Sequence, residues 1–281
     1  MKLQFLPLLL VVVCLTLGLP AQTHPDPTQA RLATVARLDS LNQSDFNNLL
    51  SQAQSGDREA QYWVGLAYES GKPIPKNLPL SHQWLLKSAE QGYAPAQATV
   101  GLMYLNKGGD YGKADMWLRR AAVQGDAEAQ FWLGAAYEQG RIGSPDYAEA
   151  LNWIGKAADQ GHPDAEYLWG QMYEDGEGVA QNYATAAKWY RRAAEHVPNL
   201  GGAEVARTEL ARLYMKGLGV PRDYVLAYFW YALAGFDPPE AAFHMTPTQI
   251  AQAKRMAQQW ASQHAIRALQ DNVLIIENAD K

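Results

Sequence analysis

The chain has 281 residues, of which 24 are Lys or Arg and 29 are Asp or Glu, so its formal net charge is −5. Hydrophobic residues make up 48% and charged residues 19%, which is typical of a folded chain. No cluster of basic residues is present, so the sequence excludes the electrostatic footprint of a nucleic-acid-binding protein. The single cysteine, Cys14, lies in an N-terminal apolar run. The rest of the chain therefore has no disulfide, thiol nucleophile or thiolate metal site.

The N-terminus is predicted to be a signal peptide covering residues 1–21. A positive start is followed by an uncharged run from Leu3 to Leu19 and by a small-residue exit at Ala21. We therefore expect a periplasmic or secreted protein without stable membrane insertion after cleavage. The alternative is an uncleaved N-terminal membrane anchor, for which a run broken by Pro7 and Gly18 is short.

Two short segments precede the main body of the chain. Residues 22–43 contain Pro25 and Pro27 and are interpreted as a leader and linker. Residues 44–57 predict a helix with Ser44 near its capped start. This helix has no partner of its own, so we expect it to be an N-terminal capping half-repeat.

Internal repetition is the main pattern of the sequence. Five segments share an alanine, a central small residue and a tyrosine, and they cover residues 60–68, 96–104, 129–137, 165–173 and 206–214. The central residue is a glycine in the first four segments, and Ala211 takes its place in the fifth. A tryptophan follows each segment: Trp84, Trp117, Trp153, Trp189 and Trp230. The pattern predicts five units, each a hairpin of two helices.

The residues of each unit indicate how its two helices pack. The alanine and the glycine share one face of the first helix, so we expect a neighbouring helix to approach closely there. An Asp or Asn precedes each second helix as a predicted N-terminal cap: Asn77, Asp110, Asp146, Asn182 and Asp223. The tryptophans are interpreted as core anchors, because one hairpin must bury its apolar face against the next.

The combined pattern Ala-x-x-x-Leu-Gly-x-x-Tyr, a Gly-x-Gly-Val loop and Ala-x-x-Trp-x-x-x-Ala-Ala resembles the Sel1-like repeat family, a relative of the tetratricopeptide repeat. The resemblance covers residues 58–236 and implies an all-α fold, an α/α solenoid in which helix-turn-helix repeats form a right-handed superhelix. Its repeats are expected at 58–93, 94–126, 127–162, 163–202 and 203–236. The chain looks like an exported bacterial member of the family, although it lacks the disulfide that some exported members carry in each repeat.

The segment 237–281 is predicted to form a C-terminal capping helix and a tail. Thr246 is placed to cap this helix and Pro247 to occupy its first position. Its apolar face is expected to cover the last hairpin, and it comprises Ile250, Ala253, Ala257 and Trp260. For the apolar tail Val273–Ile276 two interpretations stay open, namely docking on the capping helix and a binding strand.

The sequence contains no recognisable catalytic constellation. The six histidines form no zinc-hydrolase pattern, and no nucleophile elbow or phosphate-binding loop is present. His162 and Glu166 are four residues apart, but one such pair is a common coincidence. We therefore predict no catalytic residue, no metal site and no cofactor, and we do not expect an enzyme.

A partner-binding groove is predicted on the first helices of the units. The predicted stripe takes the positions three before, one after and four after the central small residue. Its candidate residues are Tyr62, Leu66, Glu69, Leu102, Leu105, Phe131, Glu138, Tyr167, Gln171, Glu174 and Arg212. Aromatic residues beside carboxylates favour a peptide or helix with some basic character. The alternative is that several of these residues pack against the next unit.

Together these features favour a non-enzymatic scaffold or adaptor of the bacterial cell envelope, which binds a partner protein or peptide along its concave groove. One alternative is a module that binds peptidoglycan or another glycan, for which regularly spaced exposed tryptophans would be the sign. The other is a cell-wall hydrolase, for which the sequence offers no pair of nucleophile and base.

Overall fold

The computed structural model describes the backbone of residues 27–106, 109–196 and 201–279, so the predicted signal peptide lies outside the described residues. In these ranges all regular structure is helical. The helices are α1 (Pro27–Ser40), α2 (Gln43–Gln54), α3 (Arg58–Ser70), α4 (Leu78–Glu90), α5 (Ala94–Asn106), α6 (Tyr111–Val123), α7 (Ala127–Glu138), α8 (Tyr147–Asp159), α9 (Pro163–Asp175), α10 (Tyr183–Ala194), α11 (Gly202–Lys216), α12 (Tyr224–Leu233), α13 (Pro239–Phe243) and α14 (Pro247–Ala279).

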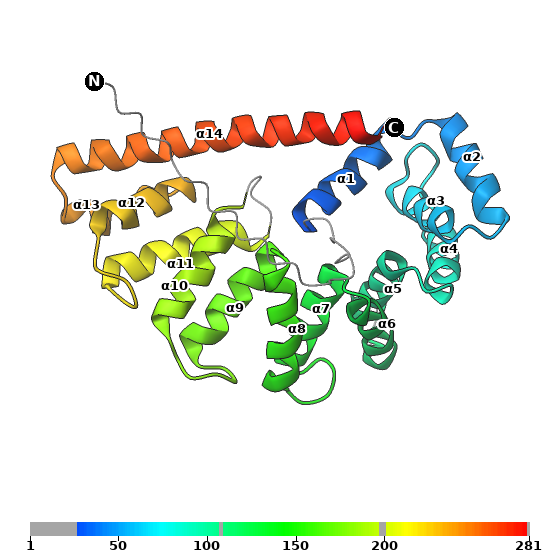
Figure 1. The fold of residues 1–281 in the computed structure, drawn as a ribbon, viewed down its shortest axis with the longest axis horizontal. Helices are drawn as coiled ribbons and strands as arrows, with labels where there is room; N and C mark the ends of the chain where they lie inside the picture. Colours follow the sequence, from blue (N-terminus) through cyan, green and yellow to red (C-terminus); the bar gives the residue numbers. More distant parts are fainter. Residues whose placement is uncertain (1–26, 107–108, 197–200, 280–281) are drawn as a thin grey trace, which may run out of the picture.

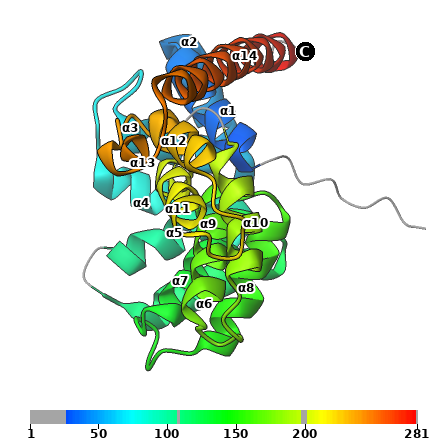
Figure 2. The same ribbon diagram turned by 90° about the vertical axis from the view of Figure 1, so that its left-hand side faces the viewer.

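The helices from α3 to α12 form five consecutive hairpins, which we call units one to five, stacked into an arc (Figure 1). Each first helix packs on its own second helix and on the helix that precedes the unit, which is α2 for unit one. The long helix α14 spans the opening of the arc, and α1 lies inside it (Figure 1). The view turned by 90° shows α14 at one edge of the molecule, with α12 and α1 beneath it (Figure 2). The predicted all-α solenoid is thus confirmed.

The helix glycines set the distance between the two helices of a unit. A methyl group on Gly65 would lie 2.7 Å from Cγ of Leu85 in the second helix. At Gly134 it would lie 2.5 Å from Cγ1 of Ile154 and 2.9 Å from its backbone nitrogen. Contacts this short leave no room for a side chain, which confirms the predicted close approach.

The predicted caps and tryptophans have the expected structural roles. Each Asp or Asn named above accepts a hydrogen bond from a backbone N–H in the first turn of a second helix. Trp117, Trp153 and Trp230 are buried, whereas Trp84 and Trp189 are half-buried. A Lys or Arg three residues later lies over the ring in each of the first four units. These basic side chains cover one face of each indole ring.

A ladder of buried glutamines joins consecutive units. Gln61, Gln97 and Gln130 hold the same position in the first helices of units one to three, and all three are buried. Each Nε2 donates to the backbone carbonyl of an alanine near the end of the preceding helix, at 3.1, 3.0 and 3.0 Å. Each Oε1 accepts from the glutamine that ends the second helix of the same unit, at 2.8, 2.7 and 2.7 Å. One side chain therefore connects three helices.

Unit four uses charged groups in the same place. Glu166 takes the ladder position and is 1% exposed. Its carboxylate accepts from Arg192 at 2.8 Å and lies 2.9 Å from Nε2 of His196. Because a carboxylate cannot donate, Arg192 also supplies the hydrogen bond to the carbonyl of Ala158, at 3.2 Å.

Unit five ends the ladder with an arginine. The Nε of the buried Arg207 donates to the carbonyl of Ala194 at 2.9 Å, and its Nη2 donates to the carbonyl of His196 at 3.1 Å. The ring of Trp260 from α14 covers this guanidinium, with 5.1 Å between Cζ and the ring centroid. Helix α14 therefore caps the stack, as the sequence predicts.

The two ends of the chain differ from expectation in three details. Helix α1 covers residues 27–40, where the sequence indicated a leader and linker, because Pro27 stands at the first helical position, which tolerates proline. The cap of α2 is Asn42 rather than Ser44. Helix α14 continues to Ala279 through the apolar tail, so the binding strand is not present. From Thr248 onward the sequence contains no Gly or Pro that would end a helix.

We predict that Gln130→Met lowers the free energy of unfolding by about 1–3 kcal/mol, because it leaves a buried carbonyl and the Gln160 amide without their partners. Methionine is close to glutamine in shape, so the change isolates the hydrogen bonds. Urea denaturation followed by circular dichroism measures the effect. The control is Gln83→Met on the exposed face of α4, and equal losses for both variants would contradict the ladder's role.

Candidate functional site

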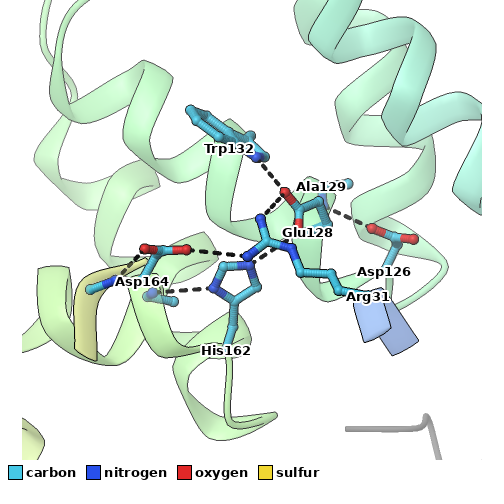
Figure 3. Close-up of polar contacts among 9 residues, drawn as sticks. Arg31, Asp126, Glu128, Ala129, Trp132, His162 and Asp164 are labelled. Carbon is cyan, nitrogen blue, oxygen red and sulfur yellow. Dashed lines mark hydrogen bonds and ion pairs between the residues drawn. The ribbon is translucent and has the colours of Figure 1, made fainter. Parts of the chain in front are cut away.

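Helix α1 brings an arginine to the inner side of the arc, where two units meet. Nη2 of Arg31 lies 2.9 Å from Oε1 of Glu128 in α7, and its Nη1 lies 3.5 Å from Oδ2 of Asp164 in α9 (Figure 3). The two carboxylates come from units three and four. The inner side of the first helices is therefore the concave face of the stack, and α1 lies on it.

Local helix signals place Glu128. Asp126 caps α7 by accepting from the N–H of Ala129 at 2.8 Å, so Glu128 stands in the first turn, where a negative charge is favoured. Nε1 of Trp132, one turn later, donates to Oε1 of Glu128 at 2.7 Å. Figure 3 shows the arginine and the indole converging on this carboxylate.

His162 contacts the second carboxylate oxygen of Glu128, on the side away from Trp132. It is fully buried and caps α9, and its Nδ1 accepts from the N–H of Ala165 at 3.3 Å. Since Nδ1 is an acceptor, the ring proton lies on Nε2, which is 3.3 Å from Oε2 of Glu128 and donates to it. The ring of Phe131 stacks on the imidazole at a centroid distance of 4.8 Å.

These partners keep Glu128 ionised. Burial opposes the charge, but the hydrogen bond from His162 and the charge of Arg31 outweigh it and lower the pKa of Glu128 to about 2. Asp164 is held as well, because its Oδ1 accepts from the N–H of Gly202 at 2.6 Å. The pair thus forms an anionic site, which the guanidinium of Arg31 occupies.

A second site of the same kind lies on unit one. Nη1 of Arg37 lies 3.3 Å from Oε1 of Glu59, and its guanidinium lies over the ring of Trp63 at 4.0 Å. Nε1 of Trp63 donates to the same carboxylate at 3.1 Å. Asp39 of α1 forms a further ion pair with Lys72 at 2.6 Å.

The two sites occupy one register. Glu59 and Glu128 stand six residues before the helix glycine, and Trp63 and Trp132 stand two before it. Asp164 holds the carboxylate position in unit four. In units one and three the concave face thus presents a carboxylate beside an indole, a combination that binds a guanidinium through charge and through the ring face.

The predicted stripe lies one residue away from this register, and much of it packs between neighbouring units. Tyr62 and Leu66 contact the apolar cluster around Leu85 and Trp117. Leu105 is buried in the neighbouring cluster around Leu118, and Leu102 packs against that cluster. Phe131 stacks on His162, and Tyr167 stacks on Tyr190 at 5.7 Å. The structure therefore gives these side chains a role in packing, and their role in partner binding stays a prediction.

The polar members of the stripe are half-buried. Arg212 donates to Glu174 and, at 2.6 Å, to Glu209, so that units four and five are joined by charge. The hydroxyl of Tyr190 donates to Glu174 at 3.0 Å. Burial opposes the charge of Arg212, but these carboxylates raise its pKa above the usual range. Half-buried residues without a place in this network are Glu69, Glu138 and Gln171.

The sequence analysis missed Glu59, Trp63, Glu128, Trp132 and Asp164. The recurrence of Glu and Trp at fixed distances before the glycine in units one and three was the available signal. His162 and Glu166, the pair considered for a metal, have different partners. No group of three or more potential metal ligands occurs in the described part of the chain. No described helix is both long and apolar enough to span a membrane.

The comparisons with known proteins agree with this architecture. The model of the Sel1 repeat matches residues 58–93, 94–126, 127–162, 163–196 and 205–235. A protective antigen of uropathogenic Escherichia coli with an SLR fold shares 31% identity at a TM-score of 0.73, over 85% of this chain and 54% of that one. The chain therefore spans about half the length of that antigen.

A Sel1 repeat protein from Oxalobacter formigenes shares 29% identity at a TM-score of 0.62, over 83% of this chain and 87% of that one. A comparison with curated proteins gave no match.

We predict that the protein loses stability in acid through Glu128. A lowered pKa stabilises the fold above the usual value of 4.5, and this contribution is lost as the pH falls toward 2. The difference corresponds to at most about 3 kcal/mol. Urea unfolding at pH 7, 4.5 and 3 measures it, with Glu128→Gln as the comparison. If the variant and the wild type lose the same free energy between pH 4.5 and 3, Glu128 is not responsible.

Proposed function

Because the chain belongs to the Sel1 repeat family, we propose that it is a non-enzymatic scaffold of the bacterial cell envelope that binds a partner protein or peptide along its concave face. Proteins with Sel1 repeats generally mediate protein–protein interactions, and members of the family are generally non-catalytic scaffolds. The concave face and the envelope location are the parts that this proposal adds.

The repeated carboxylate and indole on the concave face carry the proposal. A solenoid displays the same position of each unit along one continuous surface, so a feature repeated in register forms a linear array of contacts. A segment of the chain itself, α1, occupies these positions in units one and three, and this contact supports the binding of a helical peptide there. Groups held this way bind a ligand without reorganising.

The alternative of a glycan-binding module lacks its main support. Sugar rings stack on exposed aromatic faces, but three of the five periodic tryptophans are buried and the other two are covered by Lys87 and Arg192. The hydrolase alternative has no supporting cluster either, since the acidic groups on the concave face are paired with arginines.

Partner binding on the concave face is tested by photo-crosslinking in cells. We expect a crosslinking amino acid at Val205, which is 45% exposed and holds in unit five the position that Glu128 holds in unit three, to give a discrete adduct with one protein. The matched control is Val123 at the end of α6, which is 73% exposed. Adducts of the same kind from both positions, or none from Val205, would contradict partner binding on the concave face.

The envelope location rests on residues 1–21 and has its own test. We predict that the chain recovered from the periplasmic fraction starts at Gln22, because Ala21 is the expected last residue of the signal peptide. Intact-mass spectrometry distinguishes this product from the full chain. Recovery of the full chain in the membrane fraction would support the N-terminal anchor, and its recovery in the cytoplasm would exclude export.

A further inference from the structure

Charged side chains attach helix α1 to the units of the stack. Of its described side chains, Pro27 is buried and the others are half-buried or exposed. Its polar contacts with the units include the ion pairs of Arg31, Arg37 and Asp39, whose side chains are 39%, 46% and 54% exposed, and the guanidinium of Arg37 also lies over the ring of Trp63. Ion pairs at this exposure contribute little to stability and weaken with salt. The helix is therefore attached loosely compared with the helices of the stack.

The two sites on which α1 lies are suited to binding arginine side chains. Each presents a carboxylate whose partner indole fixes its orientation, and the Arg37 guanidinium uses both the charge of Glu59 and the ring face of Trp63. A planar guanidinium matches such a site better than the compact ammonium of lysine does. Glu59, Glu128 and Asp164 also leave this face negatively charged once α1 is removed, which disfavours an acidic partner.

The spacing of the two arginines matches the placement of the sites. Arg31 and Arg37 are six residues apart, which in an α-helix is about 9 Å along the axis and about 120° around it. Accordingly one arginine reaches units three and four, and the other reaches unit one on a different side of the same helix. A helix with another spacing presents its second arginine at a different height and angle, so we expect it to fit the two sites less well.

We propose that α1 is an intramolecular occupant of two arginine-binding sites, and that the partner presents a helical segment with two arginines six residues apart, which takes the place of α1. The identity of the partner segment rests on the proposed function, whereas the two sites and their occupancy by α1 do not.

The connection to α2 makes α1 a competitor. Only Leu41 and Asn42 separate the two helices, so α1 stays close to its sites after it dissociates. A short tether gives a high effective concentration, and a free segment of equal affinity therefore binds poorly until α1 is weakened. Competition by the tethered α1 makes the concave face selective for a ligand that matches both sites better than α1 does.

The experiment uses a fluorescein-labelled synthetic peptide of residues 27–40 and measures its binding to residues 22–281 by anisotropy. In the protein, Arg31→Ser together with Arg37→Ser releases α1 without changing the sites. We expect the peptide to bind this variant at least tenfold more tightly than the wild type, since the tethered competitor has been removed. Equal affinity for both proteins would overturn the occupancy of the sites by α1.

Two control peptides test the spacing and the charge. One carries Ala36→Arg and Arg37→Ala, which keeps the composition but moves the second arginine by one residue. The other carries Arg31→Gln and Arg37→Gln. Both are expected to bind the α1-released variant at least tenfold more weakly than the parent peptide. Equal binding of the shifted peptide would contradict the two-site geometry.

Variants of the receptor sites complete the test. In the α1-released protein, Glu128→Gln with Asp164→Asn is expected to abolish peptide binding. Glu59→Gln, at a side chain that is 55% exposed and so safe for folding, is expected to weaken it several-fold. If Glu59→Gln leaves the affinity unchanged, the site on unit one is refuted even where the double variant fails to fold. Peptide binding without any crosslinked partner in cells would retain the sites and reject the proposed function.

Discussion

The buried amides of Gln61, Gln97 and Gln130 bond to backbone carbonyls of the preceding helix, and the geometry of the stack depends on this contact. A buried amide must satisfy both its donor and its acceptor, so each one determines how far apart and at what angle three helices lie. The helix glycines then allow the two helices of a unit to touch. Since each junction has a hydrogen bond to an alanine carbonyl at the same place, the first turns of the first helices come to line one face.

The concave face follows from this regularity. Carboxylates in a first helical turn are favoured by the helix dipole, so the positions of Glu59, Glu128 and Asp164 are good for the helices as well as for a ligand. The concave face is distinguished by helix α1 of the same chain, which lies on it. An exposed set of ion pairs holds α1 in place, and such contacts suit a segment that is exchanged rather than one that stabilises the core.

Much of this architecture could be predicted from the sequence, because small residues, caps and tryptophans recur with the period of the unit. The candidate site was harder to predict, and the predicted stripe missed it by one residue. One position on a helix is a rotation of about 100°, enough to exchange the face between units for the face inside the arc. Helix α1 was missed because two prolines suggested a leader, and its place on the concave face depends on contacts with residues far away in the chain.

The ladder also has a direction. In each unit the hydrogen bond across the junction is donated to an alanine carbonyl of the preceding helix, and the series ends at Arg207, which donates to two carbonyls and packs against the ring of Trp260. A duplicated internal unit would meet an alanine carbonyl in the helix before it and would offer its own alanine carbonyl to the glutamine amide of the unit after it. The stack could therefore lengthen in its interior. Unit five is different, because Trp260 of α14 packs on its arginine. The last hairpin and α14 therefore act as one end piece, and in this chain a further unit would fit the polarity of the stack only before it.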